Sequence, residues 1–375
     1  MAFLDAIWTY VVPFLVVLTV LVFVHELGHY LVARRNGVRV EVFSIGFGRE
    51  LFGFTDRAGT RWKFSAIPLG GYVKMFGDAN AASMPGDELP GLTEDEKAES
   101  FHHKRLGQRV AIVAAGPIAN FLFAMVALAF LFATAGHPFD PPPWVGAVTP
   151  GSPAEAAGIL PGDTIVAIDG QPVGRFGDLV GLVQSGDGAP ISVDLRHDGT
   201  TVTLTLTPQM TTVTNADGVD VQVPRIGVVV DSGPYGLLRS VRLGVTETVW
   251  WTAFTLRTLG EIIVGDRGRE DLGGPIMIAQ ISGQVAQIGW VATVWFMAVL
   301  SINLGLINLF PVPMLDGGHL LYYAAEAVRG RPLGERAQEY GFRIGLVLVL
   351  TLMVFATWND LERLQVVAFL KELIF

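Results

Sequence analysis

Four stretches of this chain are apolar over nearly the length that a helix needs to cross a lipid bilayer, and this feature limits the possible folds most strongly. A membrane-spanning helix needs about 20 predominantly apolar residues. The stretches cover about residues 6–32, 110–135, 290–310 and 344–358. The fourth is short, but Arg343 and Trp358 can anchor its ends at the membrane interfaces. We therefore predict an α-helical membrane protein with about four transmembrane helices.

The composition favours the same class. Hydrophobic residues make up 51% of the chain and charged residues 16%, which is unusual for a soluble globular protein. A net charge of −9 offers no overall basic field, so we expect no nucleic-acid partner. With no cysteine among 375 residues, disulfides, thiolate metal ligands and cysteine nucleophiles are excluded.

The positive residues near the apolar stretches predict the orientation in the membrane. Lys and Arg are enriched in cytoplasmic loops. They occupy the loop after the first stretch (Arg34, Arg35, Arg39, Arg49, Arg61, Lys63, Lys74, Lys104, Arg105, Arg109) and the loop after the third (Arg329, Arg331, Arg336, Arg343). Both loops are therefore expected in the cytoplasm, with the segment 137–289 and both termini outside. Asp5 stands where a cleaved signal peptide would carry positive charge, so the first span is expected to remain in the mature protein.

The segments between the spans differ in character. After a first transmembrane region at 1–36, residues 37–106 alternate between apolar and polar around positions 38–45 and 62–66, which predicts a small hairpin or sheet beside or within the membrane. Glycines at 46, 48, 70 and 71 are expected to break it, and residues 77–100 are acidic and expected to be mobile. The second transmembrane region is 107–136.

A small α+β domain is predicted outside the membrane at 141–230. Short strands are expected at 145–148, 164–168, 191–196 and 201–207, with helices near 153–158 and 176–185. Residues 231–288 then form an interfacial helical segment, with its apolar part at 250–263. The third transmembrane region is 289–330, and 341–375 is the fourth with a C-terminal tail. No second copy of the small domain is found.

The pentapeptide His25-Glu26-Leu27-Gly28-His29 at the end of the first span predicts a metal site. In a helix, residues four apart share one face, so both imidazoles can reach one ion, and Glu26 beside them can act as the base for a water molecule. The alternative is a pair of interfacial histidines with a solvated glutamate. Such polar groups are costly in lipid unless they are paired, which favours the metal. A diiron desaturase needs more histidine clusters than this chain has, and His102-His103 is interpreted as solvated.

A catalytic zinc ion usually has three protein ligands and one open position. The best candidate for the third ligand is Asp316, which follows two prolines at the end of the third apolar stretch. Pro311 and Pro313 prevent a regular helix there, and irregular backbone at membrane depth lines a cavity or is buried in protein. His319 is a competing ligand, and a simple turn at Asp316-Gly317 is the structural alternative.

Together, HELGH in the first span and the run NLFPVPMLDGG at 308–318 resemble the site-two protease family of intramembrane zinc metalloproteases, in its RseP branch. Residues 43–48, 68–74, 116–120 and 272–276 extend the likeness over nearly the whole chain. The resemblance implies Zn²⁺ on His25, His29 and Asp316, with Glu26 activating water. It implies substrate contact or support of the site by the following residues: Asn308, Asn120, Gly70 and Gly71.

The resemblance also implies substrates and a location. The implied substrates are single-span membrane proteins of the anti-sigma factor type, cut after a first external cleavage, and remnant signal peptides. The implied location of the enzyme is the bacterial inner membrane, with its PDZ-like domain in the periplasm. RseP-type proteins often carry two PDZ domains, and this chain has room for one, so whether that domain binds peptides or excludes bulky substrates stays open. The alternative function is an inactive membrane-anchored PDZ adaptor with a structural metal. An adaptor has no need of Glu26, so the intact motif favours the enzyme.

Overall fold

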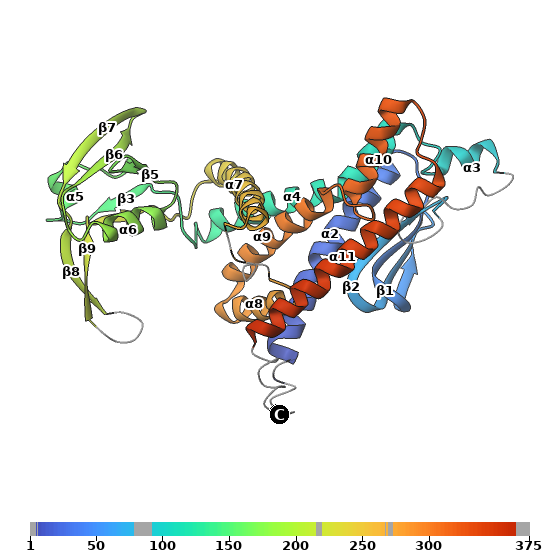
Figure 1. The fold of residues 1–375 in the computed structure, drawn as a ribbon, viewed down its shortest axis with the longest axis horizontal. Helices are drawn as coiled ribbons and strands as arrows, with labels where there is room; N and C mark the ends of the chain where they lie inside the picture. Colours follow the sequence, from blue (N-terminus) through green and yellow to red (C-terminus); the bar gives the residue numbers. More distant parts are fainter. Residues whose placement is uncertain are drawn as a thin grey trace. The chain divides into compact units, whose positions relative to one another are not determined.

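The computed structural model describes residues 5, 7–78, 92–214, 220–266, 268 and 273–364. Its contacts divide the chain into two compact units (Figure 1). One unit comprises Met1–Phe130 and Val241–Phe375, and the other comprises Leu131–Ser240. The predicted C-terminal tail from residue 365, and Leu272 of the predicted motif at 272–276, lie outside the described residues.

Helices dominate the described chain. They are η1 (Ile7–Val11), α2 (Val12–Arg35), α3 (Glu94–Glu99), α4 (Leu106–Thr134), α5 (Pro153–Ala156), α6 (Phe176–Ser185), α7 (Leu237–Val264), α8 (Pro275–Ile288), α9 (Trp290–Leu309), α10 (Asp316–Arg329) and α11 (Glu335–Arg363). Four helical stretches are long and apolar enough to cross a membrane: Ile7–Arg35, Leu106–Thr134, Trp290–Leu309 and Arg336–Arg363. Each overlaps one of the four predicted spans, so by length and composition the chain has four candidate membrane-spanning helices.

The last two predicted spans differ from the structure in their limits. The fourth was expected at 344–358, yet α11 runs over Glu335–Arg363, because the polar residues at both ends continue the helix although they lower the apolar signal. The third predicted region at 289–330 is two helices. Helix α9 ends at Leu309, and α10 starts at Asp316 after the segment that contains Pro311 and Pro313.

Strands β1 (Val40–Thr55) and β2 (Arg61–Met75) form the predicted hairpin, packed against α2 (Figure 1). Both strands are longer than expected because the glycines bend them instead of ending them. Gly46, Gly48 and Gly70 have φ values of 88°, 86° and 114°, and the strands curl so that Ser44 pairs with both Tyr72 and Lys63. These conformations are easily reached by glycine.

A buried cluster fixes this hairpin on the helices that carry the site. It joins α2, the hairpin, the segment after α3, α4 and α10 through buried residues: Ala33, Val38, Val40, Phe43, Ile45, Val73, Met75, Phe101, Ile112, Val113 and Tyr323. Phe43 and Trp62 stack with their ring centroids 4.2 Å apart. Burial of these side chains stabilises the arrangement, since a fully buried large apolar side chain contributes about 1.5–3 kcal/mol.

The acidic segment 77–100 was expected to be mobile throughout, and part of it is ordered. Residues Glu94–Glu99 form α3, which begins with a capping box between Thr93 and Glu96. A capping box satisfies backbone N–H groups at a helix start, which favours this short helix. Residues 79–91 of the same segment lie outside the described part of the chain.

The second unit is an α+β fold around its own core. Its strands are β3 (Val145–Val148), β4 (Thr164–Ile168), β5 (Gln171–Pro172), β6 (Ile191–His197), β7 (Thr200–Leu206), β8 (Gln209–Thr214), β9 (Asp220–Arg225) and β10 (Val228–Val230). A four-stranded sheet has the order β5-β4-β6-β7, while β3 pairs with β10 and β8 with β9. The predicted strands and helices are found within one or two residues. The β8–β9 hairpin was not expected.

Two helices occupy the region predicted as one interfacial segment at 231–288. Helix α7 extends well beyond the apolar part at 250–263, and α8 follows it. Helix α7 also packs against α9, where Trp251 and Trp295 lie 6.4 Å apart between ring centroids and Thr255 donates a hydrogen bond to Asn303 at 2.9 Å. These contacts join α7 to α9 along its apolar part.

Candidate metal centre

Helix α2 carries His25 and His29 one turn apart on its buried face. Residues four apart in an α-helix lie one above the other, so the two rings face the same side. Their Nε2 atoms are 3.3 Å apart, and both residues are less than 10% exposed. Two buried imidazoles whose Nε2 atoms lie this close together are positioned to share a bound ion.

Asp316 reaches the same place from the first residue of α10. The preceding segment folds back over the start of this helix, and Met314 has a φ of 90°, a strained value for a residue with a side chain. A β-carbon at Gly318 would lie 2.7 Å from Pro313 Cα, and one at Gly317 would overlap the carbonyl oxygens of Leu309 and Phe310. The two glycines after Asp316 are therefore required for the close approach of the chain that positions its carboxylate.

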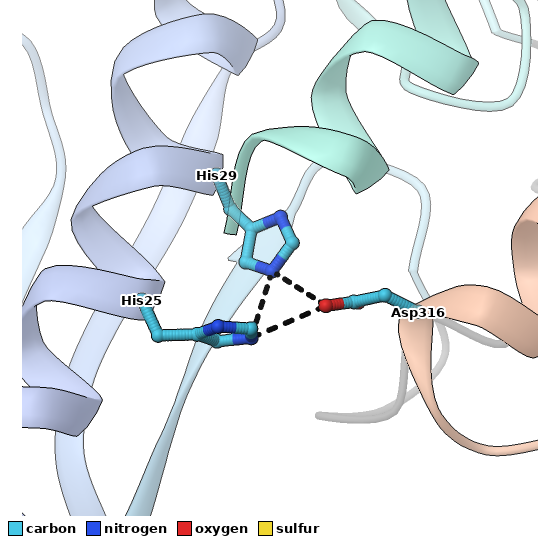
Figure 2. Close-up of side chains that lie close together, drawn as sticks. All are labelled: His25, His29 and Asp316. Carbon is cyan, nitrogen blue, oxygen red and sulfur yellow. Dashed lines mark hydrogen bonds and ion pairs between the residues drawn. The ribbon is translucent and has the colours of Figure 1, made fainter. Parts of the chain in front are cut away.

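The three side chains converge on one point (Figure 2). Asp316 Oδ2 lies 3.2 Å from His25 Nε2 and 3.5 Å from His29 Nε2. Among the described residues this is the one group of three or more His, Cys, Asp or Glu side chains whose ligand atoms all lie within 4.8 Å of one another. Two nitrogens and one oxygen, with a fourth position left over, are the donor set of a catalytic zinc site.

The opposite edges of the imidazole rings are held by α4, which leaves both Nε2 atoms free for a metal. His29 Nδ1 lies 2.9 Å from the carbonyl oxygen of Ile112, and His25 Nδ1 lies 3.1 Å from the side-chain amide of Asn120. Metal-binding histidines almost always donate their second ring N–H to a carbonyl, carboxylate or water, and the contact of His29 with Ile112 has this form. Asp316 Oδ2 is buried and accepts no conventional hydrogen bond within the described chain, so a cation fits the vacant acceptor.

Two small residues allow α4 to approach these rings. A β-carbon at Gly116 would lie 2.6 Å from His29 Cε1 and 2.8 Å from His25 Cε1. A β-carbon at Gly28 would lie 2.7 Å from Ala119 Cβ, so α2 and α4 touch backbone to backbone at this level. Neither Gly28 nor the Ile112 carbonyl was singled out from the sequence. The Gly116-Pro117 pair inside an apolar helix was the available signal for this contact.

Glu26 follows His25 in α2 and lies beside β2. The backbone of Val73 hydrogen bonds to its carboxylate, and a β-carbon at Gly71 would lie 3.3 Å from Glu26 Cγ. The same β-carbon would lie only 2.8 Å from Val22 Cγ1, so Gly71 has no space for a side chain. The hairpin backbone is thus brought directly beside the carboxylate next to the two histidines.

The remaining predicted residues are placed as follows. His319, the competing ligand, lies outside the converging group. Asn120 is fully buried at the His25 ring. Asn308 donates to the carbonyl of Leu304 in its own helix at 3.0 Å and is half-buried. Gly70 lies beside Gly71 in β2, where a β-carbon would lie 2.6 Å from the Phe47 ring.

Comparison with known proteins identifies the family of this chain. The model of peptidase family M50 matches residues 13–352, which is most of the chain. The chain belongs to peptidase family M50. A protein of Agrobacterium fabrum described as a candidate zinc metalloprotease is 48% identical over 95% of this chain and 96% of its own length. Metalloprotease MmpA of Caulobacter vibrioides is 39% identical, covering 96% of this chain and 98% of that protein.

The RseP resemblance is confirmed. The regulator of sigma-E protease RseP from Salmonella typhimurium is 34% identical over 96% of this chain and all of that protein. That alignment runs over 463 positions, more than the 375 residues here, so the Salmonella protein contains additional sequence. The M50 peptidase described here is therefore a zinc metalloprotease with Zn²⁺ as its cofactor.

Among solved structures, the PDZ domain of an SdrC-like protein from Listeria innocua is 26% identical with a TM-score of 0.19. It covers 24% of this chain and 91% of that domain. A second PDZ domain, from an SdrC-like protein of Listeria monocytogenes, is 22% identical with the same TM-score.

Proposed function

We propose that this M50 peptidase hydrolyses peptide bonds of membrane-spanning substrates within the bilayer, using His25, His29 and Asp316 as zinc ligands and Glu26 as the base. The observation that carries the proposal is the convergence of three donor atoms from α2 and α10, with Glu26 next to both histidines in α2. A structural metal in an inactive adaptor would not need this carboxylate, and zinc sites that are purely structural usually have four protein ligands.

The residues divide the chemistry among them. The two imidazoles and the Asp316 carboxylate would hold the zinc ion, which supplies a Lewis acid for the scissile carbonyl and makes a water molecule more acidic. Glu26 takes the proton from the attacking water on its carboxylate oxygen and passes it to the nitrogen of the leaving amine. The Val73 backbone hydrogen bond orients Glu26 for both transfers.

The hairpin backbone at Gly70 and Gly71 is proposed to bind the substrate. An α-helical substrate hides its peptide bonds, so it must unwind before it can be cut, and a strand edge can replace its lost hydrogen bonds. Gly71 lies beside Glu26, so a segment paired with β2 at this point would run past the base. Asn308, one residue before the end of α9, is proposed to contact the same segment.

The named relatives support a proposal for the substrate class and location. Two of them, from Salmonella strains, are named as regulators of sigma E. We propose that the substrates here are single-span proteins of the anti-sigma factor type, and remnant signal peptides, cut after a first external cleavage in regulated intramembrane proteolysis. The enzyme would lie in the bacterial inner membrane with the zinc site toward the cytoplasm, which is supported by the Lys and Arg residues in the loops after the first and third spans.

The unit Leu131–Ser240 is proposed to be a periplasmic PDZ-like domain that acts as a filter. It holds its own core of apolar side chains from strands and helices, so it can fold as a bulky body. A folded body outside the membrane can reject proteins with large external parts by steric exclusion. Such a filter would explain why cleavage of the external part of a substrate must precede its cleavage within the membrane.

Replacement of Glu26 by Gln tests the proposal. The variant should bind about one zinc ion per chain, as unchanged protein does, and lose cleavage of a single-span reporter by at least the roughly 10²–10⁴-fold that a general base supplies. His25→Ala should lose zinc as well as cleavage, which separates the base from a ligand. Zinc content of detergent-purified protein and accumulation of uncut reporter are the measurements. Normal cleavage by Glu26→Gln would refute the assignment of the base.

A further inference from the structure

Asn120 lies where it can decide which nitrogen of His25 is available to a metal. It is fully buried in α4, and the structure places its side-chain Nδ2 3.1 Å from His25 Nδ1. Neutral imidazole carries one proton, so the partner of Nδ1 determines whether Nε2 can act as a ligand. His25 Nε2 is the atom that faces Asp316 and His29.

The two orientations of the amide have opposite consequences. If the Nδ2 group faces His25, it donates to Nδ1, the ring proton moves to Nε2, and that nitrogen cannot bind a metal. Asn120 Oδ1 is then left buried without a hydrogen-bond partner among the described residues, which is a costly state for a carbonyl oxygen. If the amide is turned over, Oδ1 accepts from Nδ1–H and Nε2 is free for the metal, while the Nδ2 group takes the buried position that the oxygen held. The amide has nearly the same shape in both orientations.

Backbone contacts hold Asn120 at this height on α4. Ser301 of α9 donates a hydrogen bond to its carbonyl oxygen at 2.9 Å, and a β-carbon at Gly305 would lie 3.2 Å from Asn120 Cβ. The residue is therefore packed between α2 and α9 and cannot turn away to another partner. We propose that Asn120 is a positioning residue whose Oδ1 accepts the Nδ1 proton of His25 and so fixes the ring with Nε2 toward the zinc ion.

This inference rests on the proposed zinc site, and zinc affinity of the full-length chain tests it. Asn120→Asp keeps an acceptor and removes the donor, so it should retain an affinity close to that of unchanged protein. Asn120→Leu keeps the approximate volume without an acceptor and should weaken zinc binding by about 10–100-fold, the usual effect of losing a hydrogen-bond partner of a ligand. Competition with a chromogenic chelator in detergent measures both.

Asn303→Leu is the matched control. Asn303 is another amide between helices, bonded to Thr255 and not to the histidines, so its loss should leave zinc affinity unchanged. Unchanged affinity in Asn120→Leu, or equal losses in Asn120→Asp and Asn120→Leu, would overturn the acceptor role. If His25→Ala also kept its zinc, the site assignment itself would fail, and that outcome is distinct from failure of the Asn120 inference alone.

NMR of the zinc-loaded wild-type chain with isotope-labelled histidine gives a second measurement that does not depend on folding of a variant. His25 should show a protonated Nδ1 and a metal-bound Nε2. A metal-bound Nδ1, or a proton on Nε2, would overturn the proposal even if Asn120→Leu does not fold.

Discussion

Gly116 can be tested by the smallest possible change, a single methyl group. In Gly116→Ala the added β-carbon would lie 2.6 Å from His29 Cε1 and 2.8 Å from His25 Cε1. Non-bonded carbon atoms normally lie about 3.5–4.0 Å apart, so each ring would have to move by roughly 1 Å. The His29 ring is restrained by its 2.9 Å hydrogen bond to the Ile112 carbonyl and has little freedom to comply.

The size of the effect follows from the tolerance of a metal site. Ligand distances are held within about 0.2 Å, so a displacement of roughly 1 Å removes a ligand or distorts two. We expect zinc affinity to fall by at least about 100-fold, the upper end of what loss of a supporting partner costs. The added methyl should destabilise the fold by only about 1–3 kcal/mol, the usual cost of overpacking.

Gly107→Ala provides the comparison within the same helix. A β-carbon at Gly107 meets no atom within 4 Å in the described part of the chain, so alanine should bind zinc normally and be neutral or up to about 1 kcal/mol more stable. Chelator competition and thermal unfolding of both purified variants are the assay. Wild-type zinc affinity in a folded Gly116→Ala protein would show that the rings do not lie against this glycine.

Two further results are expected. Arg109 forms a largely buried ion pair with Glu326, which joins α4 to α10. Glu326→Gln should lower the free energy of unfolding by about 3 kcal/mol, because it leaves the Arg109 charge buried without its partner. An unchanged melting temperature would contradict this. The Asp163 carboxylate accepts a hydrogen bond from His197 and raises the pKa of that ring. This pair therefore stabilises the second unit fully below about pH 6.5 and less as pH rises through the raised value. NMR titration should show the pKa returning toward its ordinary value in Asp163→Asn, and no change would show that the pair does not form.

Much of the architecture could be read from the sequence because its signals are local. A run of about 20 apolar residues can satisfy its backbone in lipid only as a helix, so the four spans were predictable. HELGH places two histidines on one helical face by spacing alone. Strand β6 alternates clearly between buried and partly exposed residues, whereas β8 and β9 are largely exposed. The limits of α7 and α11 were missed because polar residues continue those helices.

The sequence predicted the residue types of the candidate site but not which of them come together. Spacing could not decide between Asp316 and His319, and the structure brings Asp316 to the two imidazoles because Gly317 and Gly318 let the chain fold back beneath it. The hydrogen bond from His29 to a main-chain carbonyl has no side-chain signal at all, since every residue carries that group. Sequence supplied the ligand types. The approach of α4 and α10, set by the space that glycines leave, decided which of them meet, because contact between distant segments depends on packing and not on local pattern.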